Sequence, residues 1–114
     1  MRQKIYVLGI LFLFCAQLRA QKEFTNWYFG DNAGLVFEEN FSTYLIDGQT
    51  NGAINPATIS DKDGNLLFYF GNGIVFDKSH NVMLNGNDIL SRAINTGTII
   101  IPKPNSSGLY YLIT

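Results

Sequence analysis

The sequence predicts an all-β fold built from short antiparallel meander sheets, arranged as β-propeller-like blades. Runs of β-branched and aromatic residues are bounded by Gly, Asn, Asp and Pro, which is typical of strands joined by turns. No window after residue 20 keeps apolar residues at helical spacing. Similar segments also recur along the chain. A self-contained β-sandwich is the alternative architecture.

Length and composition limit the class of protein. The chain has 114 residues, of which 15% are charged and 14% aromatic, as expected for one ordinary folded domain. That balance argues against a disordered segment and against a basic nucleic-acid-binding face. A single Cys and a single His exclude an internal disulfide and a structural zinc site. We therefore expect no cofactor and no nucleic-acid partner.

The first twenty residues have the pattern of a secretory signal peptide. Arg2 and Lys4 form a basic start, residues 5–16 are uncharged and apolar, and a small residue, Ala20, closes the segment. The apolar run is shorter than the roughly 20 residues that a membrane span needs. We predict cleavage between Ala20 and Gln21.

This leader defines two parts: a signal peptide (1–20) and a partial propeller-like region (21–114). We expect a secreted or cell-surface protein with no membrane span after the leader is removed. Cys15 lies inside the apolar run and follows Phe14. A lipid-modified cysteine normally follows a small residue, so a cysteine discarded with the leader is favoured.

Nine short runs are candidate strands, each bounded by turn-forming residues. In chain order they are Asn26–Phe29, Gly34–Phe37, Thr43–Ile46, Ala57–Ser60, Leu66–Phe70, Ile74–Phe76, Asn81–Leu84, Thr98–Ile101 and Leu109–Ile113.

The connections between these runs have recognisable turn chemistry. Asp61–Asn65 (DKDGN) predicts a tight hairpin loop, because Asp and Asn cap their own backbone and Gly64 accepts a positive φ. Gly71–Gly73 (GNG) predicts a second one. Pro102 and Pro104 cannot donate to a ladder, so they end the preceding strand.

Two runs, Leu66–Phe70 (LLFYF) and Thr98–Ile101 (TIII), are apolar at nearly every position. A strand with one solvated face would alternate with polar residues. Both strands are therefore predicted to be buried on both faces, between two layers.

An internal repeat supports the propeller interpretation. With Trp27 aligned to Phe68, WYFGDNAGLVF lies over FYFGNGIVF with a two-residue gap, and a weaker third copy starts at Leu109. Repeats of about 40–50 residues that hold four short strands are typical of propeller blades. The chain has room for about two blades, whereas closed propellers have about four to eight. We expect an N-terminal fragment, or blades completed by the rest of a longer protein or by another chain.

Three segments also carry a family resemblance: residues 26–37 (NWYFGDNAGLVF), 58–86 (TISDKDGNLLFYF followed by GNGIVFDKSHNVMLNG) and 98–114 (TIIIPKPNSSGLYYLIT). Together they resemble the N-terminal propeller-like region of large secreted or surface proteins of gliding bacteria. In that family the region commonly precedes PKD-type domains or a gliding-motility-associated C-terminal sorting domain. The resemblance covers nearly all of residues 26–114.

The sequence departs from the family pattern at three places. Ile54-Asn55-Pro56 precedes ATIS where the family often has Glu-Gly-Cys, Phe76 replaces a Trp, and residues 91–97 replace a stretch rich in Ser, Thr and Gln. None affects a catalytic group, because the family has no established catalytic residues. The resemblance implies type IX secretion and an exported, non-catalytic binding or structural module, with an extracellular glycan or protein as partner. The alternative is part of an exported glycan-active hydrolase on a propeller scaffold.

Asp61 and Asp63 are the only candidate metal ligands, because with Asn65 they are similar to part of a calcium loop. The EF-hand pattern requires Gly after the third ligand and a later Glu. Here Gly64 follows the second Asp, and the chain continues into a strand. A plain hairpin turn is therefore favoured.

The other candidate chemistry is weaker. His80 has Asp77 near it in sequence but no adjacent nucleophile, so a structural hydrogen-bonding role in a turn is favoured. A pair of catalytic carboxylates stays open as a possibility, because spatial proximity is invisible in sequence; the remaining carboxylates are Glu23, Asp31, Glu38, Glu39, Asp47 and Asp88.

The repeated aromatic residues could stack on carbohydrate, but packing between blades is favoured for most of them; they are Trp27, Tyr28, Phe68, Tyr69, Tyr110 and Tyr111.

Overall fold

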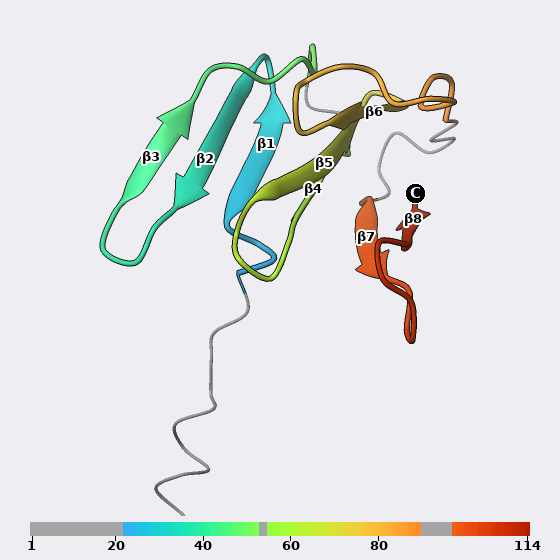
Figure 1. Ribbon diagram of the computed structural model, residues 1–114. Helices are drawn as coiled ribbons and strands as arrows, with labels where there is room; N and C mark the ends of the chain where they lie inside the picture. Colours follow the sequence, from blue (N-terminus) through green and yellow to red (C-terminus); the bar gives the residue numbers. More distant parts are fainter. Residues whose placement is uncertain (1–21, 53–54, 90–96) are drawn as a thin grey trace, which may run out of the picture.

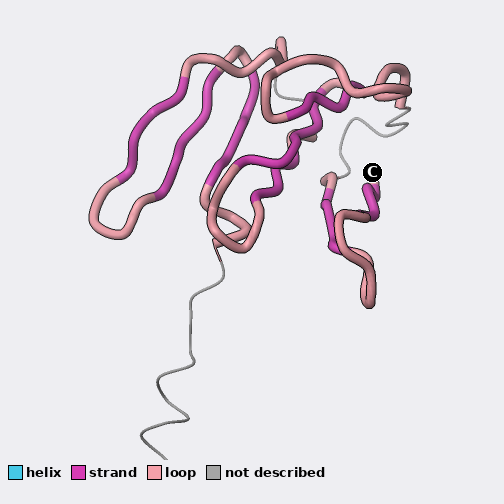
Figure 2. Tube along the Cα trace, in the orientation of Figure 1, coloured by secondary structure: helices cyan, strands magenta, loops and turns pink. Residues whose placement is uncertain are grey.

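The computed structural model describes residues 22–52, 55–89 and 97–114, and over these ranges the chain is all-β (Figures 1 and 2). Eight strands form three small antiparallel sheets, in the orders β1-β2-β3, β4-β5-β6 and β7-β8, and none of the sheets is closed. The strands are β1 (Asn26–Gly30), β2 (Ala33–Phe37), β3 (Ser42–Leu45), β4 (Ala57–Ser60), β5 (Leu66–Gly71), β6 (Ile74–Asp77), β7 (Ile99–Pro102) and β8 (Tyr110–Ile113). The all-β class and the meander order are thus confirmed.

The prediction of a strand at Asn81–Leu84 is wrong. Only one isolated bridge forms there, between Phe76 and Val82, because the chain turns again at once and the Gly86 N–H donates to the Met83 carbonyl. The segment still runs along the outer edge of β6. The Met83 N–H donates to the Val75 carbonyl, and the Val75 N–H donates to the Gly86 carbonyl. An irregular segment therefore protects this edge from pairing with another chain.

The two aligned repeat segments form hairpins with turns of the same kind, although β1-β2 has a register shift between Tyr28 and Gly30 that β5-β6 lacks. Gly30 pairs with Ala33 across a turn whose central residues both have positive φ, and Gly71 pairs with Ile74 across a turn of the same kind. Such two-residue turns match the twist of the flanking strands. Both turns have the same length, so the two-residue gap in the sequence alignment has no counterpart here.

A stack of three aromatic rings forms the core between the first two sheets. Tyr28 of β1, Tyr69 of β5 and Phe76 of β6 are all buried. The Tyr28 and Tyr69 ring centroids lie 4.5 Å apart with an interplanar angle of 19°, and those of Tyr69 and Phe76 lie 5.2 Å apart at 17°. Leu45, Leu66 and Ile74 pack against the stack.

Side chains of β4 form hydrogen bonds with the outer edge of β1, where no strand pairs with it. The Tyr28 N–H donates to Thr58 Oγ1 at 2.9 Å, and the Asn26 side chain donates to Ser60 Oγ at 3.0 Å. Ser60 is almost completely buried. Two hydroxyl groups thus replace a neighbouring strand, and they fix β1 against β4 without a backbone ladder.

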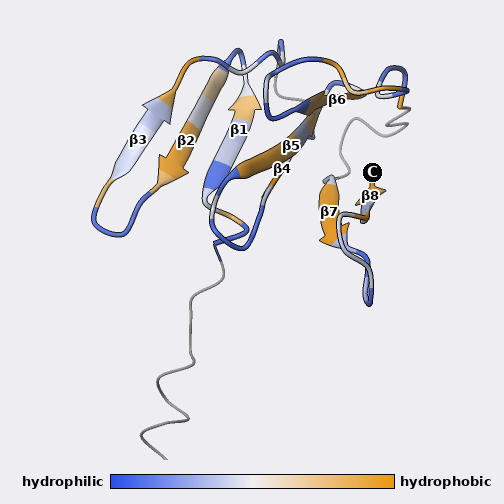
Figure 3. Ribbon diagram, viewed as in Figure 1, coloured by the Kyte–Doolittle hydropathy of each residue, from blue (hydrophilic) through white to orange (hydrophobic). Residues whose placement is uncertain are grey.

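The hairpin β7-β8 lies on the other side of the second sheet. Phe68 of β5 contacts Tyr110 of β8 edge to face, with ring centroids 5.3 Å apart. The two-sided burial predicted for LLFYF agrees with this arrangement, since Tyr69 faces the first sheet and Phe68 faces the hairpin. Figure 3 shows β7 in the colour of strongly apolar residues.

The same expectation is wrong for TIII. Ile100 is buried, but Ile99 is 53% exposed and Ile101 39% exposed. Ile99 and Ile101 point away from the second sheet, and no described residues form a further layer over them. The uninterrupted apolar run therefore leaves one face of the hairpin in contact with solvent.

We predict that Gly34→Ala destabilises the fold. A Cβ atom at position 34 would lie 2.6 Å from the Trp27 carbonyl oxygen and 3.1 Å from the Tyr28 ring, so the β1-β2 pair must shift. Overpacking of this kind costs about 1–3 kcal/mol in the free energy of unfolding, measurable by urea denaturation. Gly97→Ala is the matched control, because its Cβ would have no neighbour within 4 Å. Equal stability of the two variants would contradict this account of the sheet packing.

Candidate functional site

Two turns of the same design flank the β5-β6 hairpin in the chain, and both lie at its open end. Asp61–Asn65 (DKDGN) precedes β5, and Asp77–Asn81 (DKSHN) follows β6. In each turn the first Asp side chain accepts hydrogen bonds from the backbone N–H groups two and four residues later. The fourth residue has a positive φ in both, 93° for Gly64 and 63° for His80.

His80 therefore occupies a position where glycine is conformationally favoured. A non-glycine residue at positive φ is uncommon and carries backbone strain unless its surroundings hold it. In this molecule the surroundings are the buried rings of the first two sheets. The imidazole lies 5.7 Å from the Tyr28 ring and 5.8 Å from the Tyr69 ring.

A polar network connects His80 to both sheets. His80 Nδ1 lies 3.1 Å from the Tyr69 hydroxyl, and His80 Nε2 lies 3.2 Å from Asp47 Oδ2. The Tyr28 hydroxyl donates to the other Asp47 oxygen at 2.9 Å, and the Gln49 N–H donates to the Tyr69 hydroxyl at 3.1 Å. We call this set of side chains, Tyr28, Asp47, Tyr69 and His80, the His80 cluster.

The hydrogen bonds of the His80 cluster assign a proton arrangement to the neutral imidazole. The Asp47 carboxylate can only accept, so Nε2 of the neutral imidazole carries the proton, and the unprotonated Nδ1 accepts from the Tyr69 O–H. The proton on Nε2 then donates to Asp47, which also accepts from Tyr28. Both ring nitrogens are thus occupied, and neither is directed at a free substrate position.

Burial raises the pKa of both tyrosines, and the nearby Asp47 carboxylate raises it further. The phenols therefore stay protonated and act as hydrogen-bond donors, as the arrangement requires. Sequence reasoning weighed His80 beside Asp77 and counted Asp47 among the carboxylates of a possible catalytic pair. The Asp77 carboxylate caps the turn, and Asp47 is the acid that contacts the imidazole. The histidine at a glycine-like position of a repeated turn was the signal that could have drawn attention to the cluster.

Asp61 and Asp63 lie in the β4-β5 turn. Asp61 Oδ1 accepts from two backbone N–H groups and Oδ2 accepts from the Asn65 side chain, which lowers the pKa of Asp61. Asp63 contacts the Lys62 ammonium group at 2.6 Å. Within the described ranges no group of three His, Cys, Asp or Glu side chains lies close enough to hold a metal ion.

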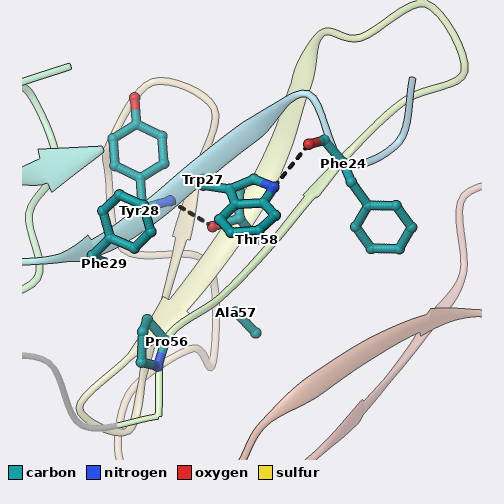
Figure 4. A pocket seen from close by; sticks show the side chains of 7 residues that line it. All are labelled: Phe24, Trp27, Tyr28, Phe29, Pro56, Ala57 and Thr58. Carbon is teal, nitrogen blue, oxygen red and sulfur yellow. Dashed lines mark hydrogen bonds between the residues drawn. The ribbon is translucent and has the colours of Figure 1, made fainter. Parts of the chain in front are cut away.

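An apolar hollow of about 280 Å³ opens beside Trp27, at the seam between β1 and β4 (Figure 4). Its aromatic lining comes from Phe24, Trp27, Tyr28 and Phe29. The Trp27 indole N–H donates to the Phe24 carbonyl at 2.8 Å, and the Thr58 hydroxyl is occupied by the Tyr28 N–H. These polar atoms are already paired, so the hollow is suited to apolar groups.

A second, wider hollow of about 660 Å³ has carboxylates at its rim. Glu38 and Glu39 follow β2, and Asp63 comes from the β4-β5 turn. Three acidic residues from two separate turns thus line one hollow, together with Lys22. Sequence reasoning had left Glu38 and Glu39 open as members of a possible catalytic carboxylate pair.

The six aromatic residues considered for carbohydrate stacking divide into two groups. Tyr28 and Tyr69 are core residues, and Phe68 packs against Tyr110. Trp27 and Tyr111 are about half exposed.

Comparisons with protein-family models, curated proteins and solved structures found no match to this chain. None of the residues that the structure describes forms a helix with the length and apolarity needed to cross a membrane.

We predict that His80→Gly lowers stability although it relieves the positive-φ backbone. The substitution removes the hydrogen bonds to Tyr69 and Asp47, worth about 1 kcal/mol or more each, and the ring contact to Tyr28, against a backbone gain of about 1–2 kcal/mol. The matched control is Asn105→Gly, another positive-φ residue but in the exposed β7-β8 loop. Urea unfolding should show a net loss only for the His80 variant. A more stable His80→Gly protein would show that the cluster does not connect the sheets.

Proposed function

We propose that this chain is an exported, non-catalytic binding or structural module of a bacterial cell-surface or secreted protein, and that it forms a propeller-like part of a longer protein. The observation that carries the proposal is the uncovered apolar surface on the meander sheets. Eight large hydrophobic side chains on the strands of the first sheet and the β7-β8 hairpin are exposed, and contiguous apolar surface of this kind is typical of a face covered by a partner.

The leader-like residues 1–20 support export, with cleavage expected between Ala20 and Gln21. The His80 cluster supports a structural role, because its hydrogen bonds connect two sheets and occupy both imidazole nitrogens. An extracellular glycan or protein is the proposed partner. Trp27 and its aromatic neighbours provide the surface on which either would pack.

The second candidate is part of an exported glycan-active hydrolase. The three carboxylates at the rim of the wider hollow favour it, because glycoside hydrolysis uses a pair of acidic side chains. The two candidates differ in whether a single carboxylate is essential to an activity.

A direct test assays the exported protein both on a glycan array and for glycan hydrolysis. We expect no turnover, and we expect any glycan binding to be lost on Trp27→Ala, which removes the central exposed ring. Glu38→Gln, Glu39→Gln and Asp63→Asn should leave binding unchanged. Turnover by the parent protein that disappears in one of these carboxylate variants would overturn the non-catalytic proposal and favour the hydrolase.

A further inference from the structure

The first sheet has an aromatic face that nothing in the described ranges covers. Trp27, Leu35 and Tyr44 form one row across β1, β2 and β3. Phe29 and Phe37 contact the Trp27 ring edge to face, at 6.2 and 5.3 Å between centroids. Tyr44 is 75% exposed. We call these five side chains the aromatic face.

The hairpin β7-β8 has a second uncovered face, made of three isoleucines and one tyrosine. Ile99 pairs with Ile113 and Ile101 pairs with Tyr111, so these four side chains lie on one side of the hairpin. All four are exposed. The opposite side, with Ile100 and Tyr110, packs on the second sheet. We call the exposed side the aliphatic face.

Three properties match the two faces to each other. Neither carries a charged side chain, so their contact desolvates no ion. One is aromatic and the other is mostly β-branched, a combination that packs well between β-strands. The apolar hollow beside Trp27 also opens next to the aromatic face, and its polar atoms are already paired.

The molecule already contains a contact between the same two kinds of surface. Phe68, which aligns with Trp27 in the sequence repeat, contacts Tyr110 of the hairpin, and Ile100 beside it is buried. The inner side of the hairpin therefore already packs on a sheet face that contains an aromatic ring. The outer side of the hairpin, the aliphatic face, is a similar apolar surface that is still exposed.

We propose that a second copy of this chain docks its aliphatic face on the aromatic face of the first. This inference rests on the proposed role as a stacked-sheet module. The contact joins two different surfaces, so each added copy leaves one of each free. Such a head-to-tail contact extends into a chain or closes into a ring, and it does not stop at a symmetric dimer.

The test uses two charge variants of the full chain in analytical ultracentrifugation. Tyr44→Glu blocks the aromatic face, and Ile99→Glu blocks the aliphatic face. Wild-type protein should form species larger than a dimer that grow with concentration. Each variant alone should be monomeric, because every contact needs both faces. A mixture of the two should form dimers and nothing larger, since only one working face remains on each partner.

Thr43→Glu is the matched control. It adds the same charge on β3 but on the opposite side of the sheet, where Thr43 is also exposed. It should associate as the wild type does, and circular dichroism verifies that all variants are folded. A monomeric wild type, a limit at dimers, self-association of either blocked variant, or equal loss in Thr43→Glu would each overturn the proposal. Glycan binding without association would leave the proposed function standing and remove only this inference.

Discussion

The ring stack of Tyr28, Tyr69 and Phe76 is the contact on which the arrangement of the first two sheets depends. Each sheet has few strands and cannot bury its apolar residues alone. The stack provides the shared core, and the hydroxyl groups of Thr58 and Ser60 fix the edge of β1 beside it. The His80 cluster adds hydrogen bonds from the hydroxyl groups of Tyr28 and Tyr69. Ring packing and hydrogen bonds therefore act at the same contact between the two sheets.

The way the sheets contact each other also explains why one face of the first sheet and one face of the β7-β8 hairpin are exposed. One face of the first sheet is used for the ring stack, and one face of the hairpin is used for the second sheet. The opposite faces carry Trp27 and Tyr44 at one side and Ile99 and Ile113 at the other, all exposed. Among the described residues, only the second sheet, β4-β5-β6, packs against another layer on both faces. A function as one part of a larger stack follows more readily from this arrangement than a function as an isolated catalyst.

Local chemistry allowed much of the fold to be predicted from sequence. Turn residues such as those of Asp61–Asn65 separate apolar runs clearly, and eight of the nine expected strands exist. The exception, Asn81–Leu84, is apolar enough for a strand, but the positive φ of His80 and the turn at Gly86 leave only one bridge. Burial of Thr98–Ile101 could not be derived from the run itself, because it depends on which layer lies outside the hairpin.

The candidate site was harder to predict because its members come from distant segments. Asp47 follows β3 and His80 follows β6, and no spacing rule relates them. The same holds for Glu38 and Asp63, which line one hollow although they come from different turns. In contrast, the role of the Asp61 carboxylate as a turn cap could be read from its neighbours.

A double-mutant cycle on Tyr28 and Tyr69 tests the central claim most directly. The free energies of unfolding of Tyr28→Leu, Tyr69→Leu and the double variant are compared with that of the parent protein. If the rings couple the two sheets, the double variant should lose less stability than the sum of the single variants, with a coupling energy of about 0.5–1.5 kcal/mol. Losses that add to within about 0.3 kcal/mol would show that the two sheets are stabilised independently, and would contradict this account.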